Sequence, residues 1–159
     1  MTKWLNATEQ QAWRSWIAMR TLLDDQLNRE LQERHGLSLS DYEILVRLSE
    51  APDRRLRMSD LAAATLASRS RLSHQIDRLE TAGIVQRMTC PEDRRGSFAA
   101  LTEHGWQTLV AAAPDHVAGV RRHFVDVLGT DAFTRLGQSC AKVAGRLCRE
   151  SGTDQQAAS

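Results

Sequence analysis

The positive charge of this sequence is concentrated in one central block, in which every basic residue is arginine. Residues 54–95 hold nine arginines and five acids, a net charge of +4, whereas residues 1–53 carry −3 and residues 96–159 balance. A guanidinium presents a planar fork of donors that suits phosphate oxygens and guanine edges. A local basic centre on a chain of net charge +1 therefore indicates a polyanionic partner.

The sequence has no comparably clear pattern for a catalytic site or a metal site. The sequence has no nucleophile with a base at a recognised spacing, no phosphate-binding glycine loop and no paired-carboxylate motif, so we expect no enzyme. His116 and His123 lie seven residues apart, but no acidic or cysteine cluster completes a ligand set. We expect neither a metal nor a cofactor.

The three cysteines are too few and too scattered for a disulfide framework, which favours a reducing cytoplasm. Cys90 stands in a polar loop and is a candidate for oxidation, whereas Cys140 and Cys148 are interpreted as small buried apolar residues. No stretch approaches the ~20 apolar residues of a membrane helix, and the N-terminus lacks a signal-peptide pattern. We expect a cytoplasmic protein that does not engage membranes.

The elements that must position the arginines are mainly helical. Apolar residues recur every three or four positions along most of the 159 residues, which include only three prolines. A first helix is expected from about Thr8 to His35, ~40 Å long and so longer than a compact domain needs. A second helix is expected to open at a capping box that begins at Ser40 and to stop at residues 51–53.

The central block then predicts a helix, a short turn and a second helix. A short strand at residues 55–57 precedes Ser59, the expected N-cap of a third helix. A fourth helix is expected from about residues 68–70 to 82, with an apolar face that leaves a polar face on its N-terminal half. The residues of this polar face that we expect to contact DNA are Ser68, Arg69, Ser70, Arg71, Ser73 and His74, with Arg78 one turn further on at a phosphate.

A β-hairpin follows the fourth helix. Strands are expected at residues 84–89 and 97–101, on either side of a polar loop whose tip carries Arg94 and Arg95. This order is a winged helix-turn-helix. It suits DNA because a helix fits the major groove while a thin hairpin tip reaches the adjacent minor groove.

The C-terminal third is again helical. Thr102 is expected to cap a helix that runs to Gly129, with a kink or break at Pro114. Thr130 then opens a last helix with an apolar seam suited to a partner helix. The seam consists of Phe133, Leu136, Cys140, Val143 and Leu147.

With these elements in place, the sequence resembles the MarR family of bacterial transcription regulators. The matching segments are Ser68-Arg69-Ser70, Asp77-Arg78-Leu79-Glu80, Gly83-Ile84-Val85-Gln86-Arg87, the wing signature Pro91-Glu92-Asp93-Arg94-Arg95, and Leu101-Thr102-Glu103-His104-Gly105. Two positions depart from the family pattern. Cys90 stands where an aspartate is usual, and His74 stands where many members have arginine, which changes the donors available to a base.

The resemblance implies a homodimer in which terminal helices intertwine and two winged domains grip a pseudo-palindrome. It divides the chain into N-terminal dimerisation helix region 1–36, winged helix-turn-helix domain 37–105, C-terminal dimerisation helices 106–150 and flexible tail 151–159. It also implies that Arg95 enters the minor groove with its guanidinium held by Asp93, since a nearby acid orients the fork.

The resemblance further implies a small, commonly aromatic, anionic effector between the dimer helices and the winged domain. Arg14, Trp16 and Arg20 are the candidates for binding it, although tryptophans at such positions also serve core or dimer packing. The predicted function is a ligand-responsive repressor that binds double-stranded DNA. Two alternatives stay open: a winged helix that binds protein rather than DNA, and a thiol sensor that uses Cys90.

Overall fold

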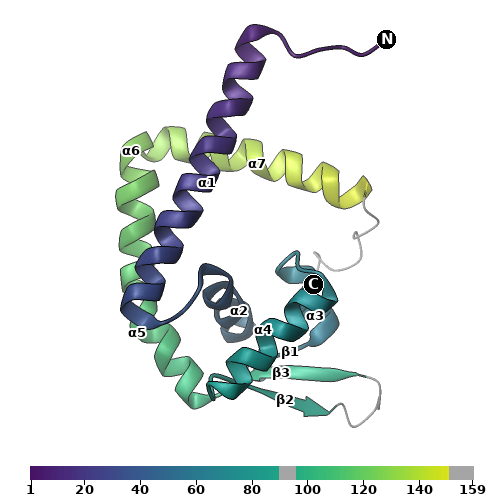
Figure 1. Cartoon of the computed structure of the whole chain (residues 1–159), viewed down its shortest axis with the longest axis vertical. Coiled ribbons are helices and arrows are strands. Elements are labelled where there is room, and N and C mark those ends of the chain that lie inside the picture. Colours follow the sequence, from purple (N-terminus) through teal and green to yellow (C-terminus); the bar gives the residue numbers. More distant parts are fainter. Residues whose placement is uncertain (90–95, 151–159) are drawn as a thin grey trace.

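The computed structural model describes residues 1–89 and 96–150 and shows a helical chain with one small sheet (Figure 1). The elements are α1 (Ala7–His35), α2 (Leu39–Glu50), the 3-10 turn η1 (Pro52–Arg54), β1 (Arg55–Arg57), α3 (Met58–Ala64), α4 (Arg69–Thr81), β2 (Val85–Thr89), β3 (Ser97–Leu101), α5 (Glu103–Val120), the π-helical turn η2 (Arg121–Val125), α6 (Asp126–Leu128) and α7 (Thr130–Glu150). The expected fold class, mainly helical with a hairpin wing, is confirmed. Among the described helices, none is both long and apolar enough to span a bilayer.

The sheet joins the hairpin to the short strand that precedes α3. Its order is β1-β3-β2, antiparallel throughout. In β1, Arg55 lies opposite Ala100 and Arg57 opposite Phe98, while β2 pairs Val85 with Leu101 at the base of the hairpin. Pairing with β1 holds the base of the wing against the rest of the winged lobe, which consists of α2, α3, α4 and the sheet.

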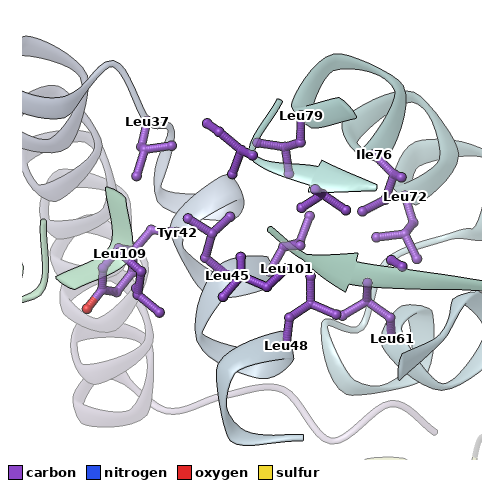
Figure 2. Packing of buried hydrophobic residues seen from close by; sticks show 14 of the residues in the cluster. Leu37, Tyr42, Leu45, Leu48, Leu61, Leu72, Ile76, Leu79, Leu101 and Leu109 are labelled. Carbon is purple, nitrogen blue, oxygen red and sulfur yellow. The ribbon is translucent and has the colours of Figure 1, made fainter. Parts of the chain in front are cut away.

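The hydrophobic core lies where α2, α3 and α4 pack on this sheet (Figure 2). Leu45, Leu48, Leu61 and Ile76 are fully buried there. Burial of each such side chain contributes ~1.5–3 kcal/mol. These residues come from α2, α3 and α4, so the same contacts that stabilise the lobe also fix the direction of α4.

The C-terminal half of α1 packs beside α5, and these helices connect the lobe to α7, while the N-terminal half of α1 projects beyond them (Figure 1). Polar contacts join them at two levels. Arg34 and His35 each lie 2.9 Å from a carboxylate oxygen of Asp115, and His123 Nε2 lies 2.7 Å from Glu30 Oε1. The bond to His35 lowers the pKa of Asp115, and bonds from Gln26 and His123 lower that of Glu30.

Two predicted helix starts are wrong. Helix α2 begins at Leu39 rather than at a box opened by Ser40: Ser38 Oγ accepts from the Asp41 N–H (3.0 Å), and the Asp41 carboxylate accepts from the Ser38 N–H (3.2 Å). Both serines are followed by an acid three residues later, and the earlier pair buries the carboxylate. Ser59 is not an N-cap either, because β1 runs directly into α3, which leaves Arg57 at the cap position.

Of the kink or break expected at Pro114, the break does not occur. Helix α5 continues through it, because Pro114 and Val110 both lie on the exposed face, where water can solvate the carbonyl that loses its donor. The irregularity occurs instead at η2, where the hydrogen bonding becomes π-helical.

The apolar seam of α7 lies open in the single chain. None of the residues of α7, all of which the structure describes, is buried, and Val143 and Leu147 are 60% and 56% exposed. Cys140 is exposed and Cys148 half-buried, so the prediction that they are buried is wrong for one chain. Helix α7 contacts α6 and η2 through the start of its seam, where Phe133 and Leu136 are half-buried, whereas Cys140, Val143 and Leu147 further along are exposed.

Gly105 provides a test of the junction between α5 and the sheet. An added Cβ would lie 2.1 Å from the backbone oxygen of Ile84. We expect Gly105→Ala to lower the free energy of unfolding by ~1–3 kcal/mol, although alanine favours helices by ~1 kcal/mol. Denaturant titration measures this loss. The control Gln107→Ala, at an exposed position of the same helix, is expected to change the unfolding free energy little, and equal effects would contradict the close contact.

His116 provides a test of pH dependence. Its ring packs on Tyr42 at a centroid distance of 4.4 Å, its Nδ1 is buried without a hydrogen-bond partner, and burial lowers its pKa from 6.5. Because the folded pKa lies below the unfolded one, stability from the neutral ring is complete above pH 6.5 and is lost as pH falls through the folded pKa. Denaturation at pH 7.5 and 5.5 is expected to show a smaller loss in His116→Phe than in wild type. Equal losses in the two proteins would contradict a lowered pKa of His116 in the folded state.

Candidate nucleic-acid interface

Helix α4 presents the predicted polar face to solvent. Its N-cap Ser68 accepts a hydrogen bond from the Arg71 N–H (3.3 Å), and its apolar face is buried against the core. Of the predicted contact residues, Ser73 is half-buried, and the structure brings the following together as exposed residues of one helix: Ser68, Arg69, Ser70, Arg71, His74 and Arg78. The first turn also leaves backbone N–H groups that can bind phosphate.

A groove of about 610 Å³ separates α4 from the base of the wing. Its lining comes from the β1–α3 junction, α4, β2 and the start of β3, and comprises Arg57, Met58, Ser59, Arg69, Leu72, Ser73, Asp77, Arg87, Gly96 and Ser97. Arg57 also lies over the Phe98 ring at 5.3 Å. Arg57 was not predicted as a site residue from the sequence. The signal was its place in the strand that precedes α3, which pairs with the wing.

Arg87 of β2 binds the side of α4 that faces the wing. Its guanidinium donates to the backbone carbonyl (3.2 Å) and hydroxyl (3.1 Å) of Ser73, pairs with Asp77, and lies 3.4 Å from Glu80. Two carboxylates more than balance the charge of this arginine. It therefore holds the wing and α4 in a fixed relation, a role that the motif containing Arg87 did not reveal because its partners lie on another element.

Arg78 has a partner on the opposite side of α4. One terminal nitrogen donates to Asp41 Oδ1 at 2.5 Å, while the Arg78 side chain remains 62% exposed. The Asp41 side chain is 6% exposed. The predicted phosphate contact thus starts from an arginine that is anchored at one end and open to solvent along the rest.

The remaining predicted DNA contacts, Asp93, Arg94 and Arg95, lie outside the described residues, as does Cys90.

The predicted effector residues separate in space. Trp16 and Arg20 line a hollow of about 270 Å³ between α1, η2 and α7, and the Arg20 guanidinium lies 5.5 Å from the Trp16 ring centre. Arg14 is exposed and is not part of this lining. A second hollow, of about 420 Å³, lies where α1 and α5 meet α2 and is lined by residues that include Leu27, Tyr42 and His116.

The comparisons with known proteins agree with this geometry. Residues 37–97 match the sequence profile of the MarR family. AbsC, a MarR family transcriptional regulator from Streptomyces coelicolor, is 53% identical with a TM-score of 0.87, and the match covers 92% of this chain and 98% of AbsC. Sco3205, a MarR family regulator from the same organism solved in complex with DNA, is 46% identical with a TM-score of 0.88, over 91% of this chain and 90% of Sco3205.

A more distant relative matches over a shorter segment. The transcriptional regulator MhqR of Bacillus subtilis is 29% identical over 98 residues, which cover 62% of this chain and 66% of MhqR. That segment amounts to just under two thirds of MhqR. The similarity to AbsC and Sco3205, by contrast, extends over nearly the whole of each chain, so it includes α1, α5 and α7 as well as the winged lobe. The chain belongs to the MarR family of transcriptional regulators.

Proposed function

We propose that the chain binds double-stranded DNA as a homodimer and acts as a ligand-responsive repressor at a pseudo-palindromic operator. The observation that carries this proposal is the exposed basic face of α4 beside a groove whose far wall is the wing. A helix in the major groove and a hairpin in the neighbouring minor groove leave one sugar-phosphate strand between them. The groove between α4 and the wing is where that strand would pass.

The charges of this groove fit a phosphate strand. Arg57 and Arg69 contribute guanidinium groups from two different elements, and the third arginine of the lining, Arg87, pairs with Asp77, the one acid of the lining. Arginine forks bind phosphate oxygens with charge-assisted hydrogen bonds. The DNA complex of Sco3205, at 46% identity, supports the same use of the lobe here.

Two copies are needed for an operator with two half-sites. Recognition helices that occupy successive major grooves must lie ~34 Å apart, one turn of DNA. The open apolar seam of α7 offers the surface that a second chain would cover, since an exposed stripe of this kind costs free energy in water. The helices outside the lobe, α1, α5 and α7, form the dimer arms and then set the spacing of the two lobes.

An effector would act by changing that spacing. The hollow between α1, α2 and α5 lies where the arms meet the lobe, and its volume of about 420 Å³ suits a small molecule. The hollow at Trp16 and Arg20 lies further along α1, against α7. A ligand in either place shifts DNA binding only through its different affinity for the two arrangements, typically ~1–3 kcal/mol.

Salt dependence tests the DNA proposal. We expect log K for operator duplex to fall linearly with log salt, and we expect Arg69→Ala to reduce the slope by about 0.9 because one fewer phosphate is neutralised. Fluorescence anisotropy at several salt concentrations measures both. The control Arg121→Ala removes an arginine that pairs with Asp126 on η2, away from α4, and is expected to leave the slope unchanged. A flat salt profile in the wild type would favour a protein-binding winged helix.

The dimer proposal is tested in the seam of α7. Leu136→Asp places an uncompensated charge in the surface proposed to be buried between two chains, so it is expected to dissociate or unfold the dimer. Analytical ultracentrifugation measures the mass. Gln138→Asp, at an exposed position two residues on, is expected to remain dimeric. A wild type that sediments as a single chain would rule out the dimer.

A further inference from the structure

The α2 side of α4 contains the one strongly buried acid among the described residues. Asp41 is 4% exposed as a residue, and its two carboxylate oxygens serve different elements. Oδ2 closes the cap of α2 by accepting from the Ser38 N–H, and Oδ1 accepts from Arg78 of α4. A buried carboxylate is costly unless it is paired, and capping alone does not require burial, since exposed acids cap helices equally well.

The end of α2 that holds Asp41 is itself fixed from the other direction. The Leu39 N–H donates to Asn28 Oδ1 of α1 at 2.9 Å, one residue into the helix. The first turn of α2 is therefore tied both to the long helix α1 and to α4. The Asp41 carboxylate is a fixed point rather than a mobile surface group.

Arg78 lies on the flank of α4 that faces away from the wing. Arg71, Gln75 and Arg78 follow each other at helical spacing, and Arg71 and Gln75 face the first turn of α2 across a small hollow of about 100 Å³ that Ser40 also lines. When α4 lies in a major groove, one phosphate strand runs on the wing side and the other runs on this flank.

We propose that Asp41 is a positioning residue for DNA binding: it holds the Arg78 guanidinium by one edge so that the exposed edge faces the phosphate strand on the α2 side of α4. This rests on the proposed DNA-binding function and adds a second strand contact to it. An arginine bridging a carboxylate and a phosphate keeps its fork oriented before DNA arrives, so less side-chain entropy is lost on binding.

A double-mutant cycle in the full chain tests this role. Arg78→Gln is expected to weaken operator binding about tenfold and to reduce the salt slope by about 0.9. Asp41→Asn is expected to weaken binding by a similar factor while the slope stays nearly that of wild type, because the cation remains but is no longer oriented. In the Arg78→Gln background, Asp41→Asn is expected to cost less than about twofold.

Ser38→Ala is the matched control for helix capping. It removes the hydroxyl that caps α2 and leaves the Asp41–Arg78 pair in place, so it is expected to lower thermal stability and leave operator affinity unchanged. Equal losses from Asp41→Asn in the wild-type and Arg78→Gln backgrounds would assign Asp41 to the cap alone and overturn the proposal. So would an Arg78→Gln variant that binds like wild type.

Two further outcomes are distinguishable. If the wild type shows no salt-dependent duplex binding, the DNA-binding function itself fails, and this proposal with it. If Asp41→Asn does not fold, NMR of the Arg78 side chain in the free wild type and in Ser38→Ala decides the point. Slow rotation of the guanidinium in both supports a held fork, and free rotation in both overturns it.

Discussion

The burial of one face of α4 is the constraint on which the interface depends. Leu72, Ile76 and Leu79 are each at most 3% exposed, and α4 packs on α3 and on β2 of the sheet. Because a helix has only one rotational setting that buries these three, the setting also decides where every other side chain of α4 points. The arginines face outward because the leucines and the isoleucine face inward. The packing that stabilises the lobe therefore also determines the direction in which its cations point.

Polar contacts then fix α4 from both flanks. Arg87 joins it to the wing through Ser73 and Asp77, and Asp41 joins it to α2 through Arg78. The two arrangements differ in burial. The Arg87 side chain is 29% exposed and its carboxylate partners are more open to solvent, so these pairs are partly screened by water. The Asp41 carboxylate is buried, and a buried carboxylate is stable only when it is paired. Apolar packing sets the face of the helix, and these pairs set its tilt between neighbours.

Sequence patterns predicted the parts of this fold that depend on local periodicity. The 3.6-residue spacing in α4 and the change of period at the hairpin gave both elements to within one or two residues, and the arginine content indicated the partner. The predicted start of α2 was wrong because Ser38 and Ser40 both satisfy the local capping rule, and only the burial of Asp41 distinguishes them. The predicted start of α3 was wrong because β1 runs directly into the helix. Arg57, Arg87 and Asp41 were missed for the same reason: their roles arise from residues 14 to 41 positions away.

The π-helical turn η2 has a geometric consequence for the arms. One additional residue in a turn rotates everything beyond it by ~100° relative to an unbroken α-helix. In this phase His123 meets Glu30 of α1, and Phe124 meets Phe133 of α7 edge to face at 5.2 Å. Winding the same residues as an unbroken α-helix, with none deleted, would rotate both rings away from their partners. The π-helical winding therefore sets the direction in which the chain leaves α5, and a change to α winding at this turn would re-aim α7 while leaving the winged lobe intact.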